Sequence, residues 1–448
     1  MTIPRIMIAA PNSGSGKTTI TCGLLQALKN TGKNPCSFKC GPDYIDPMYH
    51  RQVLGIPAGN LDTFFTDKDT TVSIFADEAD GDIAVIEGAM GLYDGVGGID
   101  ETGSSYDVAH ALDCPIVLVV DARGAGKSVL AQIKGFLDYD KYNLIKAVIL
   151  NKTSASFGKI LKPLIEEELG IKCLGVMPND NEILVSSRHL GLVLPEEIAD
   201  LKAQQEKVAD LLCANISMDE LLNIANEASE LAVNLDGNKI DNVNTKNIRL
   251  AVARDEAFCF YYRENLKMLQ RNGVELVEFS PLKDEALPEN ISGLLLGGGY
   301  PENFLSELSA NSKIKSAIKA AIDGGIPTIA ECGGFMYLLD EIQDKDGASF
   351  EMIKALNGKA FWTGKLVRFG YVSIDDKSGM KIKGHEFHYY DTDNNGEDCI
   401  ATKPIGSRSW QCIHHINGSY MGFAHLYYPS NPNFVSNFVE AMKNYGRN

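Results

Sequence analysis

The sequence predicts an α/β protein with two domains, each built around a largely parallel sheet. The chain of 448 residues exceeds the length of one ordinary domain. Apolar runs of strand length alternate with amphipathic runs of helix length in both halves of the chain. A polar segment with few apolar side chains separates the two halves. We therefore predict domains at residues 1–234 and 248–448, joined by a linker at residues 235–247.

Short apolar runs define the expected strands of the first domain. They cover Arg5 to Ala10, Pro35 to Lys39, Ile83 to Glu87, Pro115 to Asp121 and Lys146 to Asn151. Helix-length stretches separate these runs, which is typical of parallel strands joined by crossover helices. The segment from Pro195 to about Leu235 is rich in Ala, Leu, Glu and Lys at helical spacing.

The second domain resumes the same alternation. The expected strands are Ile248 to Arg254, Glu275 to Phe279, Gly293 to Leu296 and Pro327 to Ala330, and the expected helices are Tyr261 to Gln270, Asn311 to Asp323 and Met336 to Glu341. From Gly358 to Tyr428 the pattern changes to β-rich segments with many Gly, His and Tyr residues. A parallel sheet with an appended β-rich region is therefore expected.

Composition and charge limit the classes of partner. The formal net charge is −17, from 42 Lys and Arg against 59 Asp and Glu. This charge disfavours general binding to nucleic acid or to an anionic membrane surface. No apolar run reaches the length of a membrane span, and the ten cysteines show no paired short spacings. We expect an unprocessed, cytoplasmic protein with reduced thiols and with neither nucleic acid nor membrane as a partner.

A Gly/Ser loop between the first strand and a helix from Lys17 to Lys29 predicts a phosphate-binding loop. Pro11 occupies the position of the first glycine of the usual pattern, so the loop is a variant. Lys17 would reach the β- and γ-phosphates of ATP, and the Thr18 hydroxyl would bind Mg²⁺. The alternative is a turn with a solvated lysine. The expected nucleotide-binding residues are Asn12, Ser13, Gly14, Ser15, Gly16, Lys17, Thr18 and Thr19.

Polar side chains at the ends of neighbouring strands extend this site. Glu87 ends one strand and is a second candidate ligand for Mg²⁺. Asp94 follows on a Gly-rich loop, where a simple Asp-Gly turn is the alternative. Lys39, Asp43 and Asp46 follow another strand and are candidates to orient a carboxylate substrate and the metal, although turn chemistry alone could explain both aspartates.

Asn151 ends a further strand, where its amide could pair with a nucleobase edge. The aspartate typical of guanine recognition does not follow, so we favour ATP as the nucleotide.

Cys332 lies between an apolar strand and an amphipathic helix, followed by two glycines. Such an elbow presents a nucleophile, the helix N-terminus favours a thiolate, and the backbone N–H of Gly333 can contribute to an oxyanion hole. A second turn at Gly298 and Gly299 offers further N–H groups. The alternatives are a buried packing cysteine and a plain glycine turn. The candidate bases, which spacing alone does not separate, are His385, His388, His414, His415 and His425. His425 is expected at the end of a strand from Tyr420 to Ala424 that leads into a loop.

The order of these motifs resembles the cobyrinic acid a,c-diamide synthase family across essentially the whole chain. The segments that carry the resemblance are PNSGSGKTT, KCGPDYIDPMYH, VIEGAMGLYDG, LLLGGGYPE, ECGGFMYL, GHEFHYY and SYMGFAHLYYPSNP. The resemblance implies a P-loop NTPase-like synthetase domain fused to a flavodoxin-like class I glutamine amidotransferase domain.

By this resemblance, Cys332 is the nucleophile that releases ammonia from L-glutamine, and His425 is its base. Many such amidotransferases carry Glu two residues after this histidine, where this chain has Tyr427, so a dyad is expected. ATP and Mg²⁺ would convert a carboxylate of a corrinoid tetrapyrrole into an acyl phosphate, which ammonia then attacks. Asp43 and Asp94 would position the carboxylate, and the Arg188-His189 pair is a further candidate contact or an ordinary surface pair.

Three rival interpretations stay open. The acceptor could be nickel-sirohydrochlorin, in the route to the methanogenic nickel cofactor. A sibling enzyme that amidates the remaining peripheral carboxylates is a weaker match, because its substrate segment differs. The chain could also be a non-catalytic partition-type ATPase with an inactive amidotransferase-like module. A homodimer is one option for its assembly.

Overall fold

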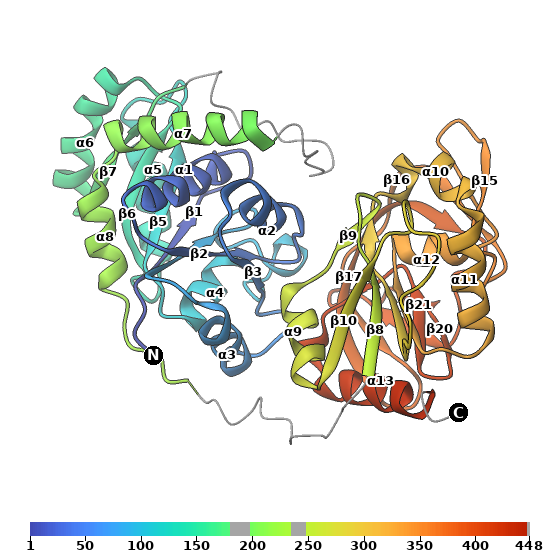
Figure 1. Ribbon diagram of the computed structural model, residues 1–448. Coiled ribbons are helices and arrows are strands. Elements are labelled where there is room, and N and C mark those ends of the chain that lie inside the picture. Colours follow the sequence, from blue (N-terminus) through green and yellow to red (C-terminus); the bar gives the residue numbers. More distant parts are fainter. Residues whose placement is uncertain (180–197, 234–247, 446–448) are drawn as a thin grey trace. The chain divides into compact units, whose positions relative to one another are not determined.

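The computed structural model describes residues 1–179, 198–233 and 248–445 (Figure 1). Tertiary contacts divide the chain into two compact units, residues 1–237 and 238–448. The predicted linker at residues 235–247 lies outside the described residues, as does the Arg188-His189 pair.

Unit 1 is built around a seven-stranded sheet in the order β3-β2-β4-β1-β5-β6-β7, and each of its pairings is parallel. The strands are β1 (Arg5–Ala9), β2 (Pro35–Cys40), β3 (Ala58–Leu61), β4 (Ile83–Glu87), β5 (Ile116–Asp121), β6 (Ile145–Asn151) and β7 (Lys172–Met177). Because β1 lies between β4 and β5, the loop that follows β1 opens at the carboxyl edge of the sheet next to Glu87.

The helices of unit 1 cover both faces of this sheet (Figure 1). They are α1 (Lys17–Asn30), α2 (Ile45–Tyr49), η1 (His50–Leu54), α3 (Lys68–Glu78), η2 (Val96–Gly98), α4 (Ser105–Ala111), α5 (Ser128–Tyr139), α6 (Ala155–Leu169), α7 (Ile198–Asn215) and α8 (Met218–Asn226). One core joins the sheet to α1, α7 and α8 through buried side chains such as Leu24, Leu212 and Ile224. This burial fixes the direction of α1, and with it the orientation of the phosphate-loop helix.

Unit 2 contains a six-stranded sheet in the order β10-β8-β11-β13-β21-β20. The first five strands run parallel, and their order matches the 2-1-3-4-5 arrangement of flavodoxin-like folds. The strands are β8 (Ile248–Ala253), β10 (Val274–Phe279), β11 (Gly293–Leu296), β13 (Thr328–Glu331), β20 (His414–Ile416) and β21 (Ser419–Gly422). The predicted class of two α/β units, a phosphate-loop sheet and a flavodoxin-like sheet, is confirmed.

The β-rich tail of unit 2 forms a separate sheet in which β16 and β17 make a long hairpin. The remaining strands are β9 (Phe258–Phe260), β12 (Gly298–Gly299), β14 (Glu341–Gln343), β15 (Ser349–Glu351), β16 (Lys359–Asp375), β17 (Lys381–Thr392), β18 (Cys399–Thr402), β19 (Ser409–Cys412) and β22 (His425–Leu426). The helices and short turns are α9 (Arg263–Arg271), η5 (Pro301–Asn303), α10 (Leu305–Ala310), α11 (Ser312–Asp323), α12 (Gly333–Leu338), η6 (Tyr428–Ser430) and α13 (Pro432–Tyr445).

Two local predictions in unit 2 are wrong. The helix expected over Met336 to Glu341 ends at Leu338, because Leu339 is extended and residues 341–343 pair with β15 and β16 as strand β14. His425 does not lie in a loop after a strand that ends at Ala424. It begins the short strand β22, which pairs with β17. Both errors arise because long-range strand pairing decided the structure of short apolar segments.

Candidate active sites

The phosphate loop of unit 1 has the backbone that close approach to a phosphate requires. Gly14 and Gly16 have φ of 78° and 98°, in the left-handed region that favours glycine. A Cβ at Gly16 would clash with the amide nitrogen of Asn151. Asn12, Ser13 and Gly14 are exposed, whereas Ser15 is buried at the base of the loop. The loop therefore offers exposed backbone groups at the start of α1.

Lys17 is buried and bends back over the loop. Its Nζ donates to the carbonyl oxygens of Met90 at 2.6 Å and Asn12 at 3.3 Å. Met90 has φ of 47°, so this carbonyl belongs to a strained backbone position. Burial lowers the pKa of Lys17 to about 8, and the nearby Lys39 ammonium contributes to this shift. The lysine is therefore partly neutral in alkaline solution.

Glu87, at the end of β4, is the centre of a buried charge cluster. Its Oε1 accepts hydrogen bonds from Thr18 Oγ1 at 2.6 Å and from Lys39 Nζ at 2.9 Å. Lys39 also pairs with Asp46 Oδ2 at 2.5 Å. The parallel register places Lys39 of β2 directly opposite Glu87. The structure therefore brings together four predicted site residues, Thr18, Lys39, Asp46 and Glu87, from the ends of three strands.

Burial controls the protonation of this cluster. Burial raises the pKa of Glu87, and the Lys39 charge opposes that shift. Burial also disfavours the Lys39 ammonium, but the Glu87 and Asp46 carboxylates outweigh this effect and raise the pKa of Lys39. The Oε2 atom of Glu87 is buried without a hydrogen-bond partner among the described residues. This oxygen and the Thr18 hydroxyl suit Mg²⁺, because the ion prefers hydroxyl, carboxylate and phosphate oxygens.

Asp43 and Asp94 lie in loops beside this cluster. The Oδ1 of Asp43 accepts the backbone N–H groups of Ile45 at 2.8 Å and Asp46 at 3.4 Å. The Oδ2 of Asp94 accepts the N–H of Gly91 at 2.9 Å. Each carboxylate thus stabilises its own turn, as the turn alternative requires, and each is only half-buried. One oxygen of each is engaged in this way.

The Asn151 side chain contacts the phosphate loop. Its Nδ2 donates to the Ser15 carbonyl at 2.7 Å, and its Oδ1 accepts the N–H of Lys152 at 2.9 Å. Lys152 Nζ contacts the Gly14 carbonyl and pairs with Asp121 Oδ2 at 3.2 Å. Sequence reasoning missed Lys152. Asn151 and Lys152 both bind backbone carbonyl groups of the phosphate loop. The Nδ2 and Oδ1 atoms of Asn151 are therefore both engaged in hydrogen bonds.

In unit 2, Cys332 occupies the predicted strand-to-helix elbow. It has φ of 47° and ψ of −104°, and its N–H donates to the Gly422 carbonyl at 2.9 Å. A side chain in this backbone region is strained, which is typical of a nucleophile at an elbow. Burial raises the pKa of the Cys332 thiol, and the Glu302 and Glu386 carboxylates add to this effect. This environment favours the neutral thiol, whereas the helix N-terminus favours the thiolate.

Three glycines surround this elbow closely. A Cβ at Gly333 would lie 3.3 Å from the backbone nitrogen of Gly299, and a Cβ at Gly298 would clash with Cε1 of His425. The structure therefore brings Cys332, the predicted oxyanion glycines and the His425 ring into one cluster. Because side chains are excluded at these positions, backbone N–H groups can approach a bound amide.

Two residues lie beside the His425 ring: Glu331, to which the sequence analysis gave no role, and His385, which it named as a candidate base. The Glu331 Oε2 atom lies 3.8 Å from His425 Nδ1. The His385 ring stacks on the His425 ring with centroids 4.9 Å apart, and Tyr262 Oη lies 3.1 Å from His385 Nδ1. Burial lowers the pKa of His385 well below its usual value, which favours the neutral ring. The other histidine candidates have separate roles.

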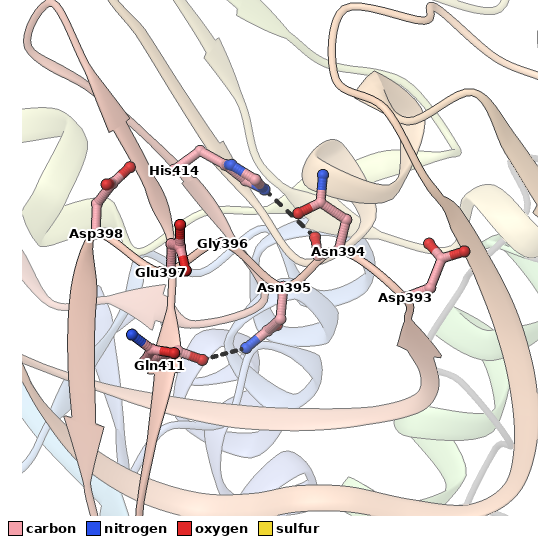
Figure 2. Close-up of a pocket in the computed structure, with 8 residues that line it drawn as sticks. All are labelled: Asp393, Asn394, Asn395, Gly396, Glu397, Asp398, Gln411 and His414. Atoms are coloured by element: carbon pink, nitrogen blue, oxygen red, sulfur yellow. Dashed lines mark hydrogen bonds between the residues drawn. The ribbon is translucent and has the colours of Figure 1, made fainter.

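His388 interacts with Glu386 at 2.7 Å and stacks on Phe423. His415 stacks on Tyr420. His414 lines a cavity of about 370 Å³ in unit 2, where its ring contacts the Asn394 carbonyl at 3.3 Å (Figure 2). The other residues that line the cavity are Asp393, Asn395, Gly396, Glu397, Asp398 and Gln411. Apart from His414, none of the residues proposed for catalysis or binding lines this acidic cavity.

Two known family models match the chain, one in each of the two structural units. Residues 6–193 match the CobQ/CobB/MinD/ParA nucleotide binding domain, and residues 249–424 match the CobB/CobQ-like glutamine amidotransferase domain. The nucleotide-binding and amidotransferase units together define an ATP-dependent ligase that forms amides with nitrogen from glutamine.

Curated relatives extend the similarity to nearly the whole chain. Cobyrinate a,c-diamide synthase of Caldanaerobacter subterraneus subsp. tengcongensis is 38% identical, with 98% of this chain and 99% of the relative covered. The enzyme of the same name from Listeria innocua serovar 6a is 36% identical, with the same coverage of 98% and 99%. This chain belongs to the cobyrinate a,c-diamide synthase family.

Similarity to solved structures is low. The chloroplast FtsY protein from Physcomitrella patens gives a TM-score of 0.32 at 19% identity, over 40% of this chain and 60% of that chain, which supports no argument. Within the described ranges, no helix combines the length and the apolar character that a membrane crossing requires.

Proposed function

We propose that this enzyme amidates the a and c acetate carboxylates of cobyrinic acid, giving cobyrinic acid a,c-diamide in cobalamin biosynthesis. The observation that carries the proposal is the presence of two complementary sites on one chain of this family. One is a phosphate loop beside the buried Lys39–Glu87 cluster, and the other is the Cys332 elbow beside His425. The first suits activation of a carboxylate by ATP, and the second suits release of ammonia from glutamine.

In unit 2, the Cys332 sulfur attacks the side-chain amide carbon of glutamine while His425 accepts the thiol proton. The N–H groups of Gly299 and Gly333 stabilise the oxyanion, and Gly298 leaves room for the imidazole. The imidazolium then gives its proton to the leaving nitrogen, so ammonia departs and a thioester remains. Water hydrolyses the thioester to glutamate and restores the thiol. Because burial raises the pKa of the Cys332 thiol, attack requires a general base.

In unit 1, a substrate carboxylate oxygen attacks the γ-phosphorus of ATP, and ADP leaves. The resulting acyl phosphate has a good leaving group, which a bare carboxylate lacks, so ammonia can displace phosphate and form the amide. Lys17 would exchange the Met90 carbonyl for the phosphates of ATP, where its charge stabilises the transferred group. Thr18 and Glu87 would hold Mg²⁺, which neutralises charge on the phosphates.

The acceptor would bind next to the Lys39 cluster. Lys39 is the closest cation to Glu87 and is already paired with Asp46, so it can orient an incoming carboxylate by exchange of partners. The second carboxylate oxygen of Asp43 and that of Asp94 would contact the acceptor or the ammonia. Asn151 would act by holding the phosphate loop, through its bond to Ser15.

Mass spectrometry of the product tests the acceptor. The purified chain, ATP, Mg²⁺ and glutamine are incubated with cobyrinic acid or, in parallel, with nickel-sirohydrochlorin. We expect two carboxyl-to-amide conversions on cobyrinic acid. Preferential conversion of nickel-sirohydrochlorin would favour the rival acceptor, and lack of turnover with both would refute a tetrapyrrole substrate. Lack of glutamine hydrolysis under every condition would favour the non-catalytic ATPase.

The assembly expectations stay predictions. A linker at residues 235–247 predicts that limited proteolysis cuts there first, and a first cut inside a flanking unit would contradict it. A homodimer predicts twice the chain mass in sedimentation velocity, and the cytoplasmic location predicts recovery in that cell fraction.

A further inference from the structure

Glu331 directly precedes the nucleophile and lies beside its base. The residue ends β13 and is 5% exposed, while His425 is 2% exposed. The carboxylate has two contacts with the start of β22. Its Oε1 accepts the N–H of Leu426 at 3.2 Å, and its Oε2 lies 3.8 Å from His425 Nδ1. One carboxylate therefore contacts both the backbone and the ring of the segment that carries the base.

The sheet explains why this carboxylate reaches the ring. Strand β13 pairs in parallel with β21, and Glu331 lies opposite Gly422, three residues before His425. The chain then enters β22, which Asn265 holds from the other side by donating to the Leu426 carbonyl at 2.7 Å and accepting the Tyr428 N–H at 2.8 Å. These contacts fix the backbone around His425. One side of its ring therefore faces Glu331.

Tyr427 provides no carboxylate in this region. Its ring is buried and packs edge-on against Tyr262 with centroids 5.1 Å apart. Tyr262 in turn interacts with His385, the ring that stacks on His425. The aromatic groups therefore set the plane of the imidazole, and Glu331 is the anionic group at its Nδ1 edge.

We propose that Glu331 orients the His425 imidazole with Nε2 toward the thiol and stabilises the imidazolium that forms when Cys332 attacks. Glu331 is then a positioning residue that turns the Cys/His pair into a triad. This inference rests on the proposed glutaminase function. The gap of 3.8 Å closes on substrate binding, as polar contacts in an empty active site commonly do. Because both groups are buried, the interaction of carboxylate and imidazolium is stronger than in water.

A structural role would use the same carboxylate only to hold the Leu426 N–H. The substitution Glu331→Gln separates the two roles, because the amide oxygen can still accept that N–H while the negative charge is lost. We expect kcat for glutamine hydrolysis to fall about 100-fold, with KM changed less than about threefold. Amidation driven by added ammonium chloride should stay at the wild-type rate, because it does not need the triad.

The pH profile gives a second readout. Glu331 and His385 are titratable groups beside the His425 ring, and the Glu302 and Glu386 carboxylates raise the pKa of the Cys332 thiol. His425 must be neutral to accept the thiol proton, so its protonation limits kcat/KM at low pH. Loss of the Glu331 charge destabilises the imidazolium, so the acid limb should move to lower pH in Glu331→Gln. The acid limb of Glu331→Asp should lie between those of the wild type and Glu331→Gln.

Glu302→Gln is the matched control, because Glu302 is a carboxyl group that acts on the thiol but belongs to η5 and not to β13, the strand that carries Glu331. It should leave the acid limb unmoved. A wild-type kcat and pH profile in Glu331→Gln would overturn the proposal, as would equal shifts in both variants. Loss of the ammonia-driven rate as well would show a structural role. Failure of the glutaminase function itself would be distinct, since Cys332→Ser would then leave glutamine hydrolysis unchanged.

Discussion

The two candidate sites of this chain are built in different ways. The site in unit 1 depends on buried charged side chains that pair with one another, centred on Glu87 and Lys39. The site in unit 2 depends on backbone shape, with a strained Cys332 and glycines that leave room for His425. In the proposed function, one unit stabilises charge on ATP and a carboxylate, whereas the other starts from a thiol and an imidazole and creates charge only during attack. The difference follows from the chemistry of the two steps.

Removal of the nucleophile should give the largest separation of the two sites. We expect Cys332→Ser to lower glutamine-dependent amidation at least about a thousandfold, because the hydroxyl is a much weaker nucleophile in this site. Amidation with ammonium chloride should survive, since unit 1 is unchanged. Cys213→Ser, at an exposed cysteine of unit 1, is the control and should leave both rates intact. Equal loss with both nitrogen sources would contradict the assignment.

Substitution of Glu87 should impair the site in unit 1 and spare the glutaminase site in unit 2. In Glu87→Gln, Lys39 loses the negative charge of its buried partner, and an amide nitrogen replaces one carboxylate oxygen beside Thr18. We expect amidation to fall about 100-fold or more with either nitrogen source, while glutamine hydrolysis persists. Breaking the buried pair should also lower the free energy of unfolding by about 3 kcal/mol, as calorimetry can measure. Retention of ATP-dependent turnover would show that Glu87 has only a structural role. Glu78→Gln, at another buried glutamate of unit 1, is the control.

A methyl group added at Gly298 tests whether the backbone of unit 2 leaves the space that the His425 ring needs. In Gly298→Ala the added Cβ meets the His425 ring, so the imidazole must move away from its place beside Gly298. We expect glutamine hydrolysis to fall about 10- to 100-fold, because small displacements of a catalytic group are costly. Gly135→Ala, where the Cβ meets no atom within 4 Å, should behave as wild type. Normal hydrolysis in Gly298→Ala would remove this glycine from the site.

The smallest effect concerns the charge of Lys17. Burial lowers the pKa of Lys17 to about 8, so its charge is present below that pH and is lost as the pH rises through it. We expect the affinity for ATP to fall several-fold between about pH 7 and pH 9.5, measured by calorimetric titration. Lys17→Arg keeps its charge over this range and should lose that dependence. An unchanged pH dependence in Lys17→Arg would assign it to another group.

The sequence was sufficient for features that depend on local pattern. It predicted the phosphate loop around Lys17, the elbow at Cys332 and the alternating strands, because glycine spacing and apolar periodicity are local signals. It also predicted that Lys39 and Glu87 share one sheet edge. It could not predict their direct pairing, because the order of strands depends on the packing of α1, α7 and α8 on the sheet.

Features set by pairing between distant segments were missed or wrong. Glu331 was not assigned because its contact with His425 depends on the register of β13 with β21, which are about ninety residues apart in sequence. The end of α12 was placed too late because Ile342 is apolar in a pattern that suits either a helix or a strand. Its pairing as β14 with β15 and β16 decides the outcome.

Transfer of oxygen-18 from the acceptor to phosphate tests whether ATP activates the acceptor carboxylate as an acyl phosphate before ammonia attacks. Cobyrinic acid labelled with oxygen-18 in its carboxylates is amidated with glutamine or with ammonium chloride, and the released phosphate is examined by mass spectrometry. Activation through an acyl phosphate predicts one labelled oxygen in phosphate for each amide formed, with either nitrogen source. Amide formation with unlabelled phosphate would contradict it.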